Sequence, residues 1–318
     1  MHRSRAMGGK FIPPLFSAGI GILLMVWACT PKAGTAAPGA SAEAPATLER
    51  PGPVDALGRS FPFRGRAERI VSLSPSVTEI LFAIGAGDQV VGVTEFCTYP
   101  PEAADRDKVG GFSGATISVE RIAALKPDLV FLSADMHERI LSFLERLGIP
   151  SFAVEPRSFE EIYTTIALIG GLTGKASGAE EVIAAMREKI GRAEKSWQGK
   201  EKPRVFWEVW DEPLLTAGGP TFINEAISLG GGTNIFSDVN EQWPEVSAEQ
   251  VLLRSPQWLL AADDHGTILD PGTLARRTGW GTLPAARPGY QGLVPADMIN
   301  RYGPRLADAV LIISGILH

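Results

Sequence analysis

The chain has 318 residues, of which 21% are charged, and its formal net charge is −6 at pH 7. This length is enough for two domains of ordinary size, each with a core of its own. A mildly acidic surface of mixed charge excludes the basic face that nucleic-acid binding requires, so we expect no nucleic-acid partner.

Residues 1–28 have the pattern of an export signal. Arg3, Arg5 and Lys10 precede the apolar run SAGIGILLMVWA, which suits the core of a secretory signal better than a bilayer span. The run ends in VWAC, which resembles a bacterial lipobox, where the Cys is lipidated and becomes the mature N-terminus. We therefore expect a lipoprotein signal peptide, lipidation at Cys29 and an extracytoplasmic, membrane-anchored protein. Cleavage without lipidation and a retained N-terminal anchor are the alternatives.

Residues 29–53 are rich in Ala, Pro and Gly and contain almost no large apolar side chain. Such a segment cannot form a core, so we expect a flexible tether. The chain has only two cysteines, and lipidation of Cys29 leaves Cys97 without a disulfide partner. Cys97 is then expected to be a small buried or half-buried residue.

The folded part begins near Val54 and alternates strands with helices. The sequence RIVSLSPSVTEILFAIGAGDQVVGV, residues 69–93, predicts a strand, a helix, a Gly-rich stop and a second strand. A helix, the strand DLVFLS, another helix and the strand IPSFAV follow. Because helices separate the strands, we expect parallel pairing with right-handed crossovers. We assign residues 54–157 to an N-terminal α/β lobe and residues 199–318, which repeat the order, to a C-terminal α/β lobe.

Residues 158–198 between the two lobes predict helix. Apolar residues recur at helical intervals, and Gly170, Gly171 and Gly174 are expected to divide the stretch into a shorter and a longer helix. We interpret it as a helical bridge, because it lies where the two lobe patterns meet. An amphipathic surface helix that belongs to one lobe is the alternative.

One short motif occurs in both lobes. Residues 114–131 and 243–261 share Ser-x-Glu, an apolar residue two places on and Pro nine places after the Ser. The matches at one offset of 129 are Ser118, Glu120, Ile122, Pro127 and Leu129 with Ser247, Glu249, Val251, Pro256 and Trp258. That spacing is too long for a solenoid and indicates two lobes built to one plan. Each Glu lies in the first turn of a helix, where a carboxylate is also favoured locally by the helix dipole.

Aromatic residues are frequent in the loops expected to face a cleft between the lobes: Phe96, Tyr99, Phe112, Trp210 and Trp243. Trp207 lies in the strand FWEVW, where it alternates with Phe206, so one of the two is expected in the core. Trp243 and Trp210 stand near Pro in loops, where a large apolar side chain is expected to serve a cleft or an interface.

From about Val54 onward the chain resembles the periplasmic substrate-binding proteins of cobalamin and iron-chelate ABC importers, and it fits the cobalamin branch best. The resemblance rests on RIVSLSPSVTEILFAIGAGDQVVGVT, YPP, VERIAALKPDLV, WPEVSAEQVL and NRYGPRLADAV. It implies two Rossmann-like α/β lobes joined by a long rigid helix, with the ligand cleft between them. It also implies cobalamin or a related corrinoid as transported ligand, no cofactor, and ABC permease and ATPase subunits as partners.

The resemblance also assigns roles to residues. It places Phe96, Phe112 and Trp243 at cobalamin-contacting positions, and Asp297 and Arg301 at polar contacts. Phe96 and Phe112 stand where the best-known branch has Tyr and Trp. It further implies that Glu120 and Glu249, one on each lobe, dock on arginines of the membrane permease.

Two other functions remain open at this point. The same scaffold could bind an iron siderophore through cleft arginines such as Arg301, or haem through an axial ligand such as Tyr99. A metal-dependent enzyme would centre on His265 in the sequence DDHG, although no second His lies at ligand spacing. The chain has no Gly-x-Ser-x-Gly and no P-loop, so we expect neither catalytic nor metal-binding residues and no enzyme.

Overall fold

A computed structural model of the protein describes residues 52–61, 65–265 and 269–318. The predicted signal peptide, Cys29 and nearly all of the predicted tether lie outside these residues. Within the described ranges, no helix combines the length and the apolar character needed to cross a membrane. The predicted boundaries at residues 157 and 198 stay predictions.

The N-terminal lobe is built on a five-stranded parallel sheet with the order β3-β2-β1-β4-β5. Its strands are β1 (Ile70–Ser72), β2 (Val90–Val93), β3 (Asp107–Lys108), β4 (Leu129–Ser133) and β5 (Ser151–Val154). All residues of β1, β4 and β5 are buried, as is typical of a parallel sheet covered on both faces. The parallel pairing predicted from alternating strands and helices is confirmed in this lobe.

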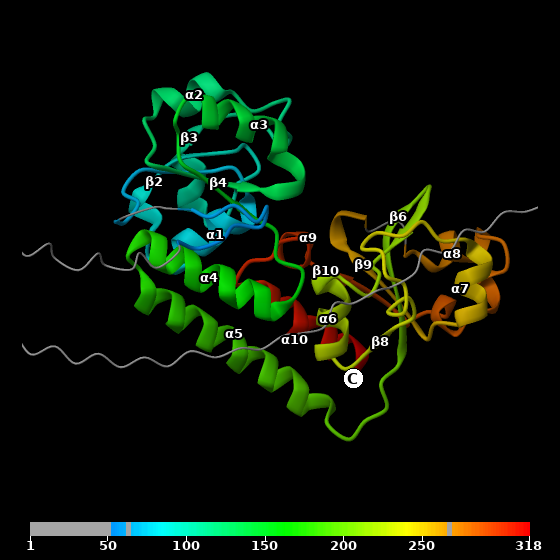
Figure 1. Ribbon diagram of the computed structural model, residues 1–318. Coiled ribbons are helices and arrows are strands. Elements are labelled where there is room, and N and C mark those ends of the chain that lie inside the picture. The colour runs from blue at the N-terminus through cyan, green and yellow to red at the C-terminus, as the bar shows by residue number, and fades with distance from the viewer. Residues whose placement is uncertain (1–51, 62–64, 266–268) are drawn as a thin grey trace, which may run out of the picture. The chain divides into compact units, whose positions relative to one another are not determined.

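Helices cover both faces of this sheet. Those of the lobe are α1 (Pro75–Ala83), α2 (Val119–Ala124) and α3 (Ala134–Arg146). Leu129 and Phe131 of β4 share a core with α1, whereas Val130 and Leu132 pack in a second core with residues of α2 and α3. Figure 1 shows α2 and α3 on the side of the lobe away from α4. The period-two alternation of side chains along a strand thus divides β4 between two cores.

Two helices form the bridge, α4 (Phe159–Thr173) and α5 (Ala176–Trp197). The predicted division is confirmed at Gly174, which ends α4 in a left-handed conformation with φ of 70°. Gly170 lies inside α4, and a Cβ there would come within 2.6 Å of the Ala179 side chain on α5. This glycine therefore lets the two helices approach closely. One continuous core runs from α1 through α4 and α5 into the C-terminal lobe.

The C-terminal lobe has the sheet order β10-β9-β6-β7, with β8 paired to β6. Its strands are β6 (Arg204–Asp211), β7 (Leu214–Thr216), β8 (Thr233–Asn234), β9 (Trp258–Ala262) and β10 (Gln291–Val294). Its helices are α6 (Phe222–Leu229), α7 (Ala248–Arg254), α8 (Pro271–Arg276), α9 (Ala296–Ile299) and α10 (Leu306–Leu317). Helix α10 packs along α5, which fixes the bridge to this lobe.

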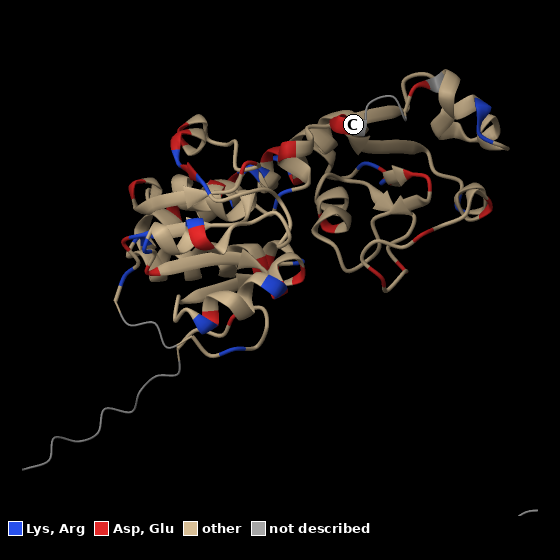
Figure 2. Ribbon diagram, turned by 90° about the horizontal axis from the view of Figure 1, so that it is seen from above, with Lys and Arg blue, Asp and Glu red and all other residues tan. Residues whose placement is uncertain are grey.

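Two details of this lobe differ from the sequence prediction. Strand β7 is antiparallel to β6, because only Glu212 and Pro213 connect them and so short a connection can only return as a hairpin. Phe206 and Trp207 are both fully buried, where the sequence had placed one of the pair in the core. The reason is that β6 is the central strand, so Phe206 enters one core and Trp207 the other. Figure 2 shows acidic and basic residues interspersed over the ribbon, as the composition predicts.

Candidate functional site

The repeated motif forms the same local structure on each lobe. Ser118 and Ser247 are the N-caps of α2 and α7, and each hydroxyl oxygen accepts a hydrogen bond from the backbone N–H three residues on. The next acidic residues, Glu120 and Glu249, are exposed in the first turn. The pKa of Glu120 is lowered, first by a backbone hydrogen bond and then by Ser118, and Ser247 lowers that of Glu249. Both lobes therefore present an ionised carboxylate to solvent at neutral pH.

The surroundings of these two glutamates differ. Beside Glu120, α2 and α3 border a groove of about 730 Å³ whose lining includes Phe143 and Arg146. The Arg146 guanidinium lies 4.4 Å from the centre of the Phe143 ring. Beside Glu249, Leu253 lies one turn further along α7 and is 87% exposed. One lobe thus offers a groove and the other a projecting apolar side chain.

A cleft of about 490 Å³ joins the two lobes. Its lining residues are Phe112 from the N-terminal lobe and Trp207, Glu208, Val209, Phe222, Ile223, Trp243, Ala262 and Asn300 from the C-terminal lobe. Phe112 and Trp243, which the sequence predicted as ligand contacts, are therefore brought to one cavity. Both rings are partly exposed, by 46% and 41%, so a ligand can reach them. An aromatic, mostly apolar wall with few polar groups is typical of a small-molecule site.

The loop that carries Phe112 is fixed by contacts to Phe96 and His137. The ring of Phe112 meets that of Phe96 edge to face, with 5.4 Å between the ring centres. The backbone carbonyl of Phe112 is 3.1 Å from Nε2 of the buried His137, whose Nδ1 accepts from the Ser133 N–H at 3.0 Å. Burial lowers the pKa of His137, which is therefore neutral near pH 7 and donates through Nε2. Phe96 and Phe112 thus form one aromatic pair at the cleft.

Glu208 is the acidic residue of the cleft, and sequence analysis missed it. Its side chain is fully buried, and its oxygens accept hydrogen bonds from the Arg277 guanidinium at 2.6 and 2.7 Å. A bidentate pair of this kind stabilises a carboxylate that would otherwise be costly to bury. The available signal was the single acidic residue inside the apolar run VFWEVW.

Asp297 and Arg301 lie together but are not free. The Arg301 guanidinium is 2.5 Å from Oδ1 of Asp297 and donates to Oε1 of Glu79 at 2.9 Å. The Arg301 side chain is only 14% exposed. Asn300, next to it in the chain, lines the cleft. The predicted polar pair therefore lies beside the cavity, and a residue of the N-terminal lobe that the sequence did not indicate holds it there.

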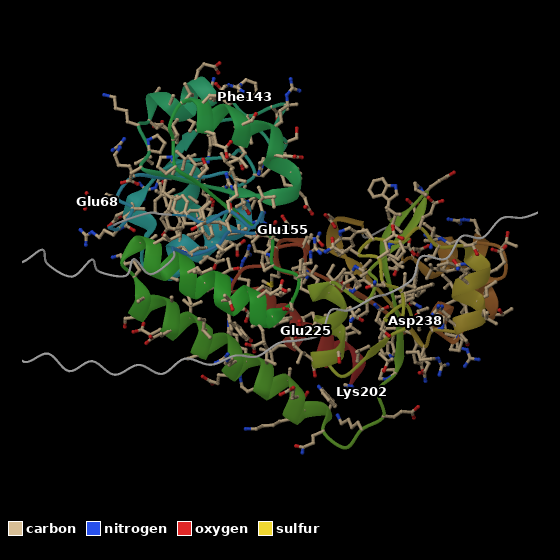
Figure 3. All side chains as sticks on the ribbon, viewed as in Figure 1. Glu68, Phe143, Glu155, Lys202, Glu225 and Asp238 are labelled. Atoms are coloured by element: carbon tan, nitrogen blue, oxygen red, sulfur yellow. The ribbon has the colours of Figure 1, made fainter. Side chains whose placement is uncertain are left out.

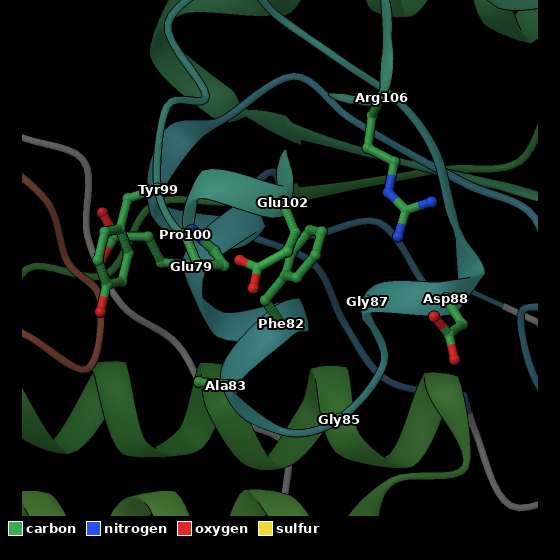
Figure 4. A pocket seen from close by; sticks show the side chains of 10 residues that line it. All are labelled: Glu79, Phe82, Ala83, Gly85, Gly87, Asp88, Tyr99, Pro100, Glu102 and Arg106. Carbon is green, nitrogen blue, oxygen red and sulfur yellow. The ribbon is translucent and has the colours of Figure 1, made fainter. Parts of the chain in front are cut away.

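Tyr99 and Trp210 lie apart from this cavity. The Arg305 guanidinium is 3.7 Å from the centre of the Tyr99 ring. Tyr99 also lines a second cavity of about 510 Å³, shown in Figure 4, which is bordered only by α1 and the segments after it in the N-terminal lobe. Trp210, which was expected in a loop, lies in strand β6 at the β6–β7 hairpin, where its Nε1 donates to the Glu212 carbonyl at 2.9 Å. Neither residue is among those that line the cleft between Phe112 and Trp243.

Two further carboxylates lie near the boundary of the lobes and are labelled in Figure 3. Glu155 accepts a hydrogen bond of 2.5 Å from the Ser133 hydroxyl, and Glu225 of α6 accepts one of 2.7 Å from the Phe159 N–H of α4. Burial raises the pKa of both. Among the described residues, no group of three or more His, Cys, Asp and Glu could hold a metal ion. The side chain of His265 lies outside the described part.

Comparisons with known proteins find relatives of this chain. Residues 70–293 match the model of the periplasmic binding protein family. The vitamin B12-binding protein of Vibrio parahaemolyticus serotype O3:K6 (strain RIMD 2210633) is 32% identical over 246 residues, 77% of this chain and 87% of that protein.

Solved structures show the same fold. The periplasmic vitamin B12 binding protein BtuF of Vibrio cholerae superposes with a TM-score of 0.68 at 31% identity, over 79% of this chain and 96% of that one. The periplasmic haem-binding protein RhuT of Roseiflexus sp. RS-1 superposes with a TM-score of 0.69 at 26% identity, over 80% of this chain and all of that one. The scaffold is thus similar to binders of two different macrocycles.

Proposed function

The chain belongs to the periplasmic binding protein family, and on that premise we propose that it captures cobalamin or a related corrinoid for an ABC importer. The observation that carries the proposal is the cleft in which Phe112 of one lobe and Trp243 of the other line the same cavity. A flat, largely apolar macrocycle with polar arms needs aromatic faces and a few polar groups, and this cleft supplies both.

The residues around the cleft suggest how the ligand is held. The corrin lies against Phe112 and Trp243, and because a corrinoid is larger than the cavity, it extends over the exposed ring of Phe96. Asp297 and Arg301 at the margin bind the polar arms. We assign no ligand contact to Trp210 and Tyr99, because neither is among the residues that line the cavity.

We assign delivery of the ligand to the surfaces around Glu120 on the N-terminal lobe and Glu249 on the C-terminal lobe. The ionised Glu120 and Glu249 dock on basic residues of the permease, where two charge contacts fix orientation more than they add affinity. The continuous core through α4 and α5 resists hinge closure, so the lobes move little on capture and the permease spreads them on release. ATP is hydrolysed by partner subunits. A lipid on Cys29 holds the protein at the membrane on the extracytoplasmic side.

Calorimetric titration of the protein with cyanocobalamin, haem and a ferric siderophore tests the ligand. We expect one-to-one binding of cyanocobalamin that is much tighter than that of the other two. Tight binding of haem or of the siderophore with none of cyanocobalamin would keep the import role and replace the ligand. Binding of none of the three would overturn the proposal.

A further inference from the structure

We propose that Glu79 is a positioning residue that sets the orientation of Arg301 at the cleft and latches the two lobes together. The inference rests on the proposed function for the identity of the ligand. The latch itself does not depend on which ligand is bound.

Glu79 is a carboxylate in an unusual place. It lies in α1 of the N-terminal lobe, within the largely apolar stretch PSVTEILFA, and its side chain is 1% exposed. A carboxylate buried to this degree is costly unless opposite charges and hydrogen bonds compensate it. Glu79 is therefore not an ordinary glutamate on the solvent-exposed face of a helix.

Both cationic partners of Glu79 come from the C-terminal lobe. Arg301 Nη1 donates to Oε1 at 2.9 Å, and Arg305 donates through Nε to Oε2 at 3.0 Å and through Nη2 to Oε1 at 2.6 Å. Charge-assisted hydrogen bonds of this length are the strong class. Three of them connect positions more than 220 residues apart in the chain.

Residues 301–305 lie against the N-terminal lobe. Tyr302, which is buried, has its hydroxyl 3.2 Å from that of Ser74. At Gly303 a Cβ would come within 3.2 Å of Oε2 of Glu79, so glycine allows the segment to approach this closely. The lobes cannot separate here without breaking the contacts to Glu79.

The same contacts reach the ligand site. Arg301 connects Glu79 to Asp297. Asn300, which lies between Asp297 and Arg301 in the sequence, lines the cleft. Arg305 covers the Tyr99 ring, on the loop that also carries Phe96. Glu79 borders the second cavity together with Tyr99 but is not among the residues that line the cleft, so it acts on the cleft through Arg301. It is therefore a positioning residue rather than a ligand contact.

Amide hydrogen exchange of the ligand-free protein tests the latch. Glu79→Gln keeps the shape and removes the charge, so we expect faster exchange at residues 297–305 and at the loop around Tyr99, with both sheets unchanged. Glu225→Gln is the control, because Glu225 connects the C-terminal lobe to helix α4 of the bridge through a backbone N–H and does not contact residues 297–305, whose exchange should stay unchanged in this variant. If exchange in Glu79→Gln became faster throughout the protein, Glu79 would have a purely structural role. If exchange did not change at all, there would be no latch.

Cyanocobalamin affinity tests the positioning. Glu79→Gln should weaken cyanocobalamin binding roughly tenfold, mainly through faster dissociation. Losses of about this size follow when a residue that orients a metal ligand through a hydrogen bond is removed. In an Arg301→Gln background the same change should have almost no further effect, because residues that act as a unit are not additive. Additive losses would contradict the proposal.

Two further results keep the outcomes distinct. If Glu79→Gln does not fold, Glu79→Asp retains the charge with a shorter reach and should give the same pattern more weakly. If the unaltered protein does not bind cyanocobalamin, the ligand assignment fails, and hydrogen exchange still decides whether the latch exists.

Discussion

The two lobes are most alike at the ends that we propose dock on the permease and least alike at the cleft. Helices α2 and α7 share a Ser cap and an exposed first-turn Glu. At the cleft, the N-terminal lobe supplies one lining residue, Phe112, whereas the C-terminal lobe supplies Trp207, Trp243 and six others. The repeated motif thus lies where we propose that the permease docks, and the two lobes differ where we propose that the ligand binds.

The two proposed docking regions, around Glu120 and around Glu249, differ in the residues that surround the glutamates. The groove beside Glu120 contains Phe143, whereas Leu253 projects beside Glu249. A shared charge with different apolar neighbours makes it possible to ask whether the charge or its surroundings governs delivery.

The largest expected effect is the loss of delivery in the variant Glu120→Ala/Glu249→Ala. Cobalamin uptake by cells that carry this variant in place of their own copy should be abolished, while the affinity for cyanocobalamin stays unchanged, because neither residue lines the cleft. Each single variant should reduce uptake by about tenfold and to the same extent if charge alone matters. Glu181→Ala, which alters an exposed glutamate on α5, is the control.

Unequal single losses would show that the groove or Leu253 contributes to docking. Normal uptake in the double variant would remove the docking assignment. Lost affinity would show instead that the cleft had been disturbed.

The sequence predicted well the features that depend on nearby residues. The caps at Ser118 and Ser247 follow from Ser followed by helix formers, and the end of α4 follows from Gly174. The alternation of strands and helices was enough to predict the parallel sheet of the N-terminal lobe. Each of these signals is contained within about a dozen residues.

The cleft could be predicted only in part, because its geometry depends on distant partners. Trp210 and Trp243 both stand near Pro, yet only Trp243 lines the cavity, since Trp210 is held at a hairpin that the sequence did not predict. Arg301 had a plausible role as a free cation, but Glu79, 222 residues away, already binds it. No local pattern reports such a pairing.

A smaller effect is expected from removing the aromatic side chains of the cleft. Trp243→Ala should weaken cyanocobalamin binding by about thirtyfold, since a large aromatic contact is commonly worth about 2 kcal/mol. Phe112→Ala should cost about tenfold, because the neighbouring Phe96 ring keeps part of the surface. Trp210→Ala, with a similarly exposed indole off the cavity, is the matched control for calorimetry. A loss at Trp210 as large as that at Trp243 would move the ligand toward the hairpin.

The smallest expected effect concerns Glu155 and Glu225, one half-buried glutamate on each lobe. Burial raises the pKa of both, and the charge of Asp135 raises that of Glu155 further. A carboxyl group whose pKa is higher in the folded than in the unfolded protein contributes stability below its unfolded value and loses it as pH rises through the folded value. At pH 7 both groups are therefore less favourable than a neutral side chain of the same shape.

Glu155→Gln and Glu225→Gln should each raise the unfolding midpoint by about 1–3 °C at pH 7, measured by circular dichroism. The gain should shrink as pH falls and disappear near about pH 4, where the glutamates of the unaltered protein are protonated too. Glu181→Gln, at an exposed position, should change nothing at either pH. A gain that grew on acidification would mean that these carboxylates are held ionised by partners. If only one of the two variants followed the expected course, the lobes would differ in how they bury charge as well as in how they bind the ligand.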